Sequence, residues 1–345
     1  MRELASGVDA LYLSGRTDLP ASLLSSLESS RVSAQESGSP APLTLGGYDW
    51  SVARHGLLKW KYRVEHPLAV IGLTGSEHLP SVRVQARSEA LHSLGADGFM
   101  AWIGSVFENE GLEVGFTVSR IDLHHDCQGW ALTGDDRHRF VCRARDLATY
   151  EADFELSGFS FGNRTSQTVT ARIYDKTREI DGKGGDWWFE HWGPRYVEGS
   201  PVYRVEFEFA RDCLRGMGLD SPTDVLPEVG RLWAYGTRDW LTYREPSAHA
   251  RAARWPVAPE WEAVQASSLG LGSLPMDRIR AGARAGSLRK LLPGLNGYVA
   301  SFAALTGEVT IGGACAALPA HLAGYEMTSG VPFAERVIEK RKSLP

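Results

Sequence analysis

Polar residues alternate with apolar ones in three short stretches of the chain, at residues 119–126, 171–176 and 203–209. Side chains two residues apart share one face of a β-strand, so each stretch predicts a strand with one apolar and one polar face. On each polar face an arginine is followed two places later by an acid or a tyrosine. The polar faces carry Arg120, Asp122 and His124 in the first stretch, Arg172, Tyr174 and Lys176 in the second, and Arg204, Glu206 and Glu208 in the third.

The rest of the chain predicts more strands, with helices inserted between them. Apolar residues at helical spacing predict helices over residues 88–94 and 98–110. A segment rich in Ser, Gly and Pro predicts a flexible loop near residues 29–47. Strands without strict β–α alternation indicate an α+β fold with a largely antiparallel sheet. Strands are expected at residues 8–14, 57–64, 68–73, 82–85, 113–124, 156–162, 168–175 and 202–209.

Length and composition predict more than one structural unit. At 345 residues the chain exceeds the common size of a single domain. Strand signals end near Pro256, and the chain beyond it is rich in Ala, Gly and Leu. We therefore expect an α+β domain at residues 1–255 and a helical C-terminal region at residues 256–345.

The charge and cysteine content narrow the class of protein. A net charge of −5 is not typical of a protein that binds polyanions over its whole surface, so binding to nucleic acid needs a local basic surface. The four cysteines are scattered and include no Cys-x-x-Cys pair, which favours a reduced, cytoplasmic protein. No apolar run reaches the ~20 residues that span a bilayer, so no membrane partner is expected.

The acidic residues of the alternating strands are candidate metal ligands. Mg²⁺ and Mn²⁺ prefer oxygen ligands, and Asp122 and Glu206 meet that need if their strands are close. His124, Asp126 and Glu208 are additional candidates. The alternative is a solvent-facing strand surface with incidental ion pairs.

A predicted hairpin tip carries groups that can bind phosphate. Gly162 and Asn163 fit a hairpin turn, and Arg164 and Ser166 follow it. An ordinary polar hairpin loop is the alternative interpretation.

Four motifs, in this order, resemble the Rep_trans family of replication initiation factors, which initiate rolling-circle replication of plasmids and phages and include some conjugative relaxases. The resemblance covers roughly residues 8–243. The motifs are the Arg-Ile-Asp-Leu strand at 120–123, the Gly-x-Arg-x-Ser hairpin at 162–166, the Arg-Ile-Tyr-Asp-Lys-x-x-Glu run at 172–179 and the Arg-Val-Glu strand at 204–206.

The resemblance implies a metal-dependent enzyme that nicks one DNA strand at an origin and keeps the 5′-phosphate on a tyrosine. A tyrosine hydroxyl with a pKa near ~10 needs a metal or a cationic neighbour to act as a nucleophile. The implied partner is single-stranded or extruded origin DNA, with a host helicase as a further candidate. Carried over to this chain, the resemblance makes Asp122 and Glu206 candidate ligands for Mg²⁺ or Mn²⁺, and Arg120, Arg164 and Arg204 candidate phosphate contacts.

One position departs from the family pattern. The family often has a tyrosine two residues before the hairpin glycine, and this chain has Ser160 there. Tyr174 lies on the polar face of its strand with Arg172 and Lys176, and these three are the expected catalytic set. A structural tyrosine is the alternative.

Three functions therefore remain open. The first is a nicking initiator that uses a tyrosine, or a conjugative relaxase with the same chemistry. The second is a non-catalytic protein that binds an origin or single-stranded DNA, which Ser160 favours. The third is a metallonuclease that uses water, for which the acidic residues are sufficient.

Overall fold

The computed structural model describes residues 1–165, 167–270, 288–329 and 332–341. The chain forms two compact units, Met1–Asp277 and Arg278–Pro345. The first unit extends past residue 255 and includes helix α8 (Pro259–Gln265). The buried Trp261 of α8 explains this, because its indole Nε1 donates to the carbonyl oxygen of Thr237 at 2.8 Å.

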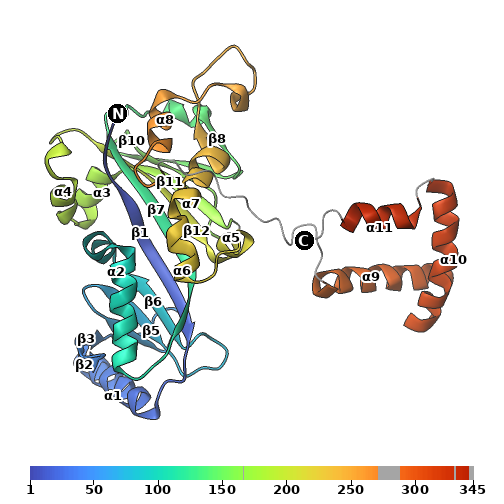
Figure 1. Cartoon of the computed structure of the whole chain (residues 1–345), viewed down its shortest axis with the longest axis horizontal. Helices are drawn as coiled ribbons and strands as arrows, with labels where there is room; N and C mark the ends of the chain where they lie inside the picture. Colours follow the sequence, from blue (N-terminus) through green and yellow to red (C-terminus); the bar gives the residue numbers. More distant parts are fainter. Residues whose placement is uncertain (166, 271–287, 330–331, 342–345) are drawn as a thin grey trace. The chain divides into compact units, whose positions relative to one another are not determined.

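A single large antiparallel sheet organises the first unit (Figure 1). The α+β prediction with a largely antiparallel sheet is confirmed, because every strand pairing recorded within the described residues is antiparallel. The order in the sheet is β2 (Ala41–Leu45), β3 (Tyr48–Val52), β4 (Tyr62–Glu65), β5 (Ala69–Leu73), β6 (Val82–Ala86), β1 (Arg2–Arg16), β7 (Gly115–Gln128), β12 (Val202–Ala210), β11 (Val169–Asp175), β10 (Glu155–Phe161) and β9 (Leu147–Ala152). A second sheet pairs β8 (Phe140–Cys142) with β13 (Leu241–Tyr243).

Helices cover the sheet and join its strands. Figure 1 shows α2, α5, α6 and α7 in front of the sheet and α3 and α4 to its left. The Phe207 ring on the apolar face of β12 meets the Trp233 ring of α7 at 5.5 Å, edge to face. The α-helices of this unit are α1 (Ala21–Ser37), α2 (Ser88–Asn109), α3 (Lys176–Lys183), α4 (Trp187–Trp192), α5 (Arg211–Gly216), α6 (Pro222–Val225), α7 (Val229–Ala234) and α8. Short 3₁₀-helices lie at Gly134–Arg139, Gly193–Arg195, Leu226–Glu228 and Ala252–Arg254, and a π-helix at Tyr235–Trp240.

The expected flexible loop at residues 29–47 is wrong. This segment contains the second half of α1, which ends at Ser37, and the whole of β2. The Ser-rich helix is stable because Leu27 and Ala34 are fully buried along one side of it. Gly38 ends α1 in a left-handed conformation with φ 74°, which glycine adopts without strain.

The two helices expected at 88–94 and 98–110 form one element, α2, with a kink. Gly95 has φ 73° and ψ 163°, which breaks the helix into two segments. The longer segment buries Phe99, Ile103 and Phe107 in the core. The short first segment is free to take another direction, and it carries His92 to the polar face of the sheet.

The second unit contains α9 (Leu288–Thr306), α10 (Ile311–Ser329) and α11 (Phe333–Arg341). Its helical character agrees with the prediction for the C-terminal region. Among the described residues, no single helix is long and apolar enough to cross a membrane. Only Leu295–Thr306 and Ile311–Glu326 taken together, with a bend of 82° between them, meet such a test of length and composition.

Candidate functional site

Strand register brings the predicted polar residues onto one face of the sheet. Glu206 of β12 lies opposite His124 of β7 and opposite Arg172 of β11. The next pairs place Glu208 opposite Asp122, and Arg204 opposite both Asp126 and Tyr174. The alternation seen in the sequence therefore corresponds to a contiguous polar surface across three neighbouring strands.

A row of three carboxylates lies in the middle of this surface. Asp122, Glu206 and Glu208 are nearly or fully buried, and arginines surround them. Arg120 binds both carboxylate oxygens of Asp122 and reaches Glu208 at 2.9 Å. Burial, together with the like charges of Glu206 and Glu208, raises the pKa of Asp122 to about 7 although Arg120 opposes the shift. The Asp122 carboxyl is therefore partly protonated near pH 7.

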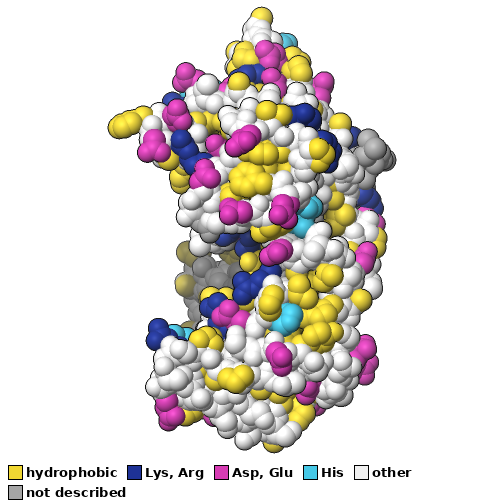
Figure 2. Space-filling model, turned by 90° about the vertical axis from the view of Figure 1, so that its left-hand side faces the viewer, with side chains coloured by type: hydrophobic (Ala, Val, Ile, Leu, Met, Phe, Trp, Pro, Cys, Tyr) yellow, Lys and Arg dark blue, Asp and Glu magenta, His cyan; other side chains and the backbone are white. Residues whose placement is uncertain are grey.

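Two further arginines border the row from the open side. Arg172 contacts Glu206 at 2.5 Å, and Arg164 contacts Glu208 at 2.7 Å. Their side chains are 44% and 53% exposed, so both guanidinium groups also face solvent. Figure 2, which views the molecule from the side of α3 and α4, shows Lys and Arg side chains gathered where the surface is hollowed at mid-height.

Arg204 and Asp126 form a buried ion pair next to this row. The Nε atom of Arg204 lies 2.6 Å from Oδ1 of Asp126, and a second nitrogen lies 2.8 Å from Oδ2. The indole of Trp192 also donates to Oδ2 at 2.8 Å, and the Trp188 ring covers the guanidinium at 4.0 Å. The sequence predicts that Arg204 contacts DNA and that Asp126 binds a metal. In the structure both side chains are buried, and they bind each other.

Arg204 also connects this ion pair to a second carboxylate, that of Asp9 on β1. Arg204 reaches the Oδ1 atom of Asp9 at 3.0 Å. Asp9 lies at an irregularity of β1, where the pairing with β7 skips a residue between Val8 and Ala10. Such a bulge re-aims a side chain, and it places the Asp9 carboxylate on the polar face.

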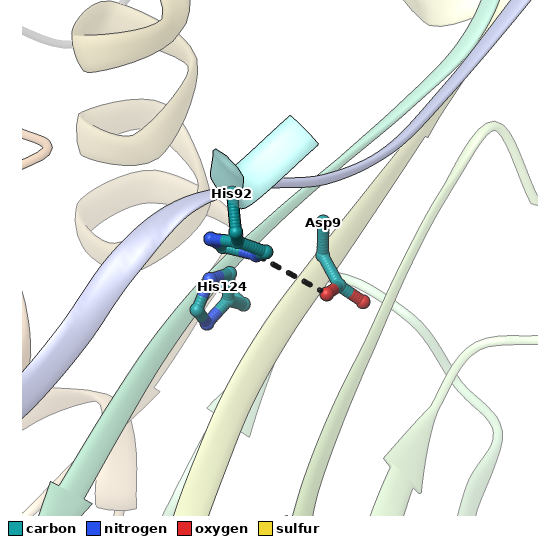
Figure 3. Close-up of side chains that lie close together, drawn as sticks. All are labelled: Asp9, His92 and His124. Carbon is teal, nitrogen blue, oxygen red and sulfur yellow. Dashed lines mark ion pairs between the residues drawn. The ribbon is translucent and has the colours of Figure 1, made fainter. Parts of the chain in front are cut away.

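Asp9, His92 and His124 form a candidate metal centre (Figure 3). One ligand atom from each residue lies within 4.8 Å of the others, and Nε2 of His92 is 3.6 Å from Oδ1 of Asp9. The Nε2 atoms of both histidines are buried and have no hydrogen-bond partner among the described residues. Two buried imidazole nitrogens that form no hydrogen bond within the described chain, together with a carboxylate, are a donor set that fits a divalent cation.

The surroundings of His124 favour the form that can bind a metal. Burial, aided by the positive charge of Arg204, lowers the pKa of His124 to about 4, so the ring is neutral near pH 7. Its other ring nitrogen, Nδ1, lies 3.3 Å from Oδ1 of Asp126. A carboxylate behind a histidine in this way orients the ring and leaves Nε2 for the metal.

Tyr174 lies on β11, next to β12, and its side chain reaches the carboxylate row. Its hydroxyl donates to Oε2 of Glu206 at 3.2 Å. Burial and the charge of Glu206 raise the pKa of Tyr174 well above its usual value, against a lowering by Arg204. Lys176, on the same side, is bound to Glu179 at 2.6 Å and lies 5.9 Å from the centre of the Tyr174 ring.

The hairpin between β10 and β11 is a turn of the expected kind. Gly162 has φ 83°, and the Asn163 side chain accepts from the backbone nitrogen of Thr165 at 3.0 Å. Arg164 therefore projects beside Glu208. Ser166, the other predicted DNA contact, lies outside the described residues.

Sequence reasoning missed Asp9 and His92. Only Asp9 has a feature in the sequence that could have indicated a functional residue. Asp9 is a lone acid in the strand Val8-Asp-Ala-Leu-Tyr-Leu, where a buried charge needs a partner. His92 has no such signal, because its position follows from the break at Gly95.

Comparisons with known proteins give a structural likeness and no match in sequence. No family model matches the chain. No curated protein matches it either. A solved rolling circle replication initiator protein from Geobacillus stearothermophilus is similar to this chain with a TM-score of 0.43 and 16% sequence identity, over 79% of this chain and 98% of the other. At these values of identity and TM-score, the chemistry of the site has to be argued from this chain's own residues.

Proposed function

We propose that this chain nicks DNA at a defined site, as a replication initiator does, with a divalent cation held by Asp9, His92 and His124. The observation that carries the proposal is the pair of buried imidazole nitrogens beside Asp9 that form no hydrogen bond to any described residue. They lie on the same sheet face as Tyr174 and the arginines that border it. The order of motifs that resembles the Rep_trans family supports the same chemistry.

The donor set favours Mn²⁺ among the ions expected from the sequence. Mg²⁺ prefers oxygen ligands throughout, whereas a site with two imidazoles suits later transition metals. Mn²⁺ accepts both kinds of donor, and so it fits two histidines with one aspartate. When bound, the cation would polarise a phosphodiester and stabilise negative charge on its oxygens.

The protein's own residues can attack the phosphodiester and accept the proton that is released. Tyr174 is the proposed nucleophile, and Glu206 accepts its phenolic proton through the hydrogen bond already present. The phenolate oxygen forms a bond to phosphorus while the bond from phosphorus to the 3′-oxygen breaks. The 3′-oxygen leaves and takes a proton from solvent to become a free 3′-hydroxyl, and the 5′-phosphate stays on the tyrosine.

The bordering arginines would position the phosphate. Arg164 and Arg172 keep exposed guanidinium groups beside Glu208 and Glu206. Planar guanidinium groups bind phosphate oxygens in a fixed geometry. Arg204 takes a positioning role, because it holds Asp126 and Asp9 in place behind the histidines.

Cleavage by water is a second candidate function. The raised pKa of Tyr174 favours it, because an uncharged, half-buried phenol is a poor nucleophile. The same metal and carboxylates would then activate a water molecule, and no covalent intermediate would form.

One experiment separates these possibilities. Supercoiled plasmids that carry the DNA on either side of the coding sequence are incubated with the full chain and Mn²⁺, and then with EDTA in place of Mn²⁺. We expect a nicked product that depends on Mn²⁺, with protein attached to its 5′ end. A nicked product with a free 5′ end would favour the water mechanism, and binding without cleavage in Mn²⁺ would overturn the proposal.

A matched pair of variants tests the metal site independently of cleavage. His124→Ala removes a proposed ligand, whereas His78→Ala changes an exposed histidine on a loop. We expect His124→Ala to lose Mn²⁺ binding in calorimetry and His78→Ala to keep it.

A further inference from the structure

A groove crosses the outer strands of the sheet and ends at the candidate site. Two cavities of about 580 Å³ and 630 Å³ share Tyr150, Ser160 and Arg172 as lining residues. Tyr150 comes from the edge strand β9, Ser160 from β10 and Arg172 from β11. The groove therefore runs across neighbouring strands toward Glu206 on β12.

The floor of the groove is made of small residues in register. Ala148 lies opposite Ser160, which in turn lies opposite Arg172. In the neighbouring row Gly158 lies between Tyr150 and Tyr174. A Cβ atom at Gly158 would lie 2.7 Å from the carbonyl oxygen of Ile173, so no larger residue fits there without a shift. The small side chains leave open space between the two tyrosines.

The walls of the groove carry an aromatic ring and positive charge. Tyr150 is 55% exposed, which leaves its ring open to solvent. Arg145, Arg164 and Arg172 line the same cavity, together with one acid, Asp146. Arg145 is exposed and forms no ion pair with any residue that the structure describes.

The spacing suits a nucleotide next to the reacting phosphate. Neighbouring strands are about 4.8 Å apart, so Tyr150 on β9 lies two strands, about 10 Å, from Tyr174 on β11. A base at Tyr150 would place its backbone near Arg164 and Arg172. A base can enter such a groove only when it is unstacked, which a duplex does not allow.

We propose that this groove binds one unpaired nucleobase of a single DNA strand, stacked on Tyr150, with Arg145 and Arg164 on the adjoining phosphates. The inference rests on the proposed function for its substrate, and it adds the place where that strand is held. Ser160 supplies a hydroxyl at the floor, where it can donate to or accept from the edge of the base.

The test is a binding measurement in EDTA, so that neither metal nor cleavage contributes. Fluorescence anisotropy compares short, labelled single-stranded oligonucleotides of mixed sequence with the same sequences as duplexes. We expect Tyr150→Ala to weaken single-strand binding about tenfold, because a base loses its stacking partner. Tyr150→Phe keeps the ring and should stay within about twofold of the wild type.

Three further variants test the floor of the groove, its charge and the specificity of the tyrosine effect in the same binding measurement. Ser160→Phe fills the groove and should weaken single-strand binding as much as Tyr150→Ala does. Arg145→Gln should weaken binding of all sequences equally and reduce the salt dependence by about one phosphate contact. Tyr298→Ala removes an exposed tyrosine from α9 and should have no effect.

The outcomes separate this inference from the proposed function. Unchanged binding in Tyr150→Ala, an equal loss in Tyr298→Ala, or equal binding of duplex and single strand would each overturn the groove. If the wild-type protein does not nick DNA in Mn²⁺ but the variants change single-strand binding as expected, the proposed function is wrong and the groove still binds the strand.

Discussion

The Nδ1 atom of His124 lies 3.3 Å from the Oδ1 atom of Asp126, two residues further along the same strand. With Nδ1 protonated, the ring donates to the carboxylate, and its Nε2 lone pair points toward Asp9 and His92. Asp126 is itself fixed by Arg204 and Trp192. A chain of buried contacts thus sets the orientation of the proposed metal ligand before any metal binds.

Removing one partner of the Arg204–Asp126 ion pair should destabilise the folded protein. Asp126→Asn leaves the Arg204 guanidinium buried with one carboxylate partner fewer, and we expect it to lower the free energy of unfolding by about 3–5 kcal/mol. Replacing both residues, as Asp126→Leu with Arg204→Met, should cost less than the single change. Urea denaturation of the three proteins measures this, and a double variant less stable than Asp126→Asn would contradict it.

Gly158 should tolerate no side chain. Its Cβ atom would meet the Ile173 carbonyl oxygen at 2.7 Å and the Tyr174 Cβ atom at 2.8 Å, so Gly158→Ala forces β10 and β11 apart. We expect a loss of about 1–3 kcal/mol in thermal or urea unfolding. The matched control is Gly115→Ala at the start of β7, where no atom lies within 4 Å, and it should change stability by no more than about 0.5 kcal/mol.

Acid should destabilise the protein partly through Asp136. Burial alone would raise the pKa of this carboxyl, but hydrogen bonds from Tyr243 at 2.6 Å and from Thr133 outweigh burial and lower it. A carboxyl with a lowered pKa in the folded state stabilises the protein above its unfolded pKa of ~3.9, and this contribution is lost as pH falls through the folded value. Urea titrations at neutral and acid pH should therefore show a smaller acid loss in Asp136→Asn than in the wild type. An equal loss in both proteins would show that Asp136 contributes nothing.

Tyr174→Phe separates catalysis from folding and metal binding. The change removes one hydroxyl and leaves the ring in place, so we expect the unfolding midpoint to shift little and Mn²⁺ binding to persist. Covalent capture of the DNA 5′ end should disappear, and nicking should fall at least about 10⁴-fold, as it does when a nucleophile is removed. Denaturing gel electrophoresis with labelled DNA reads both quantities. If the adduct remains in this variant, another residue is the nucleophile.

The alternation of residues was enough to predict the polar face. Arg120, Asp122 and His124 share it because the strand period is two, whatever the tertiary structure. The neighbours of these residues did not follow from the sequence. Which strands lie side by side decides that Glu206 faces His124 and that Arg204 reaches Asp126.

The proposed metal ligands show most clearly what could not be predicted from the sequence. His124 belongs to the predicted face, whereas Asp9 depends on a bulge and His92 on a kink at Gly95. Both irregularities redirect side chains in ways that period-two or helical spacing cannot express. The helix α1 shows the reverse case, since burial of Leu27 and Ala34 overrides a composition typical of a loop.

The ligands of bound Mn²⁺ test the account most directly. Pulsed electron paramagnetic resonance of the Mn²⁺-loaded protein detects nitrogen nuclei bound to the metal. We predict coupling to two imidazole nitrogens in the wild type and to one in His92→Ala, with both retained in Asp122→Asn. Absence of nitrogen coupling in the wild type, with loss of Mn²⁺ binding in Asp122→Asn and not in His92→Ala, would place the metal in the carboxylate row and contradict the proposal.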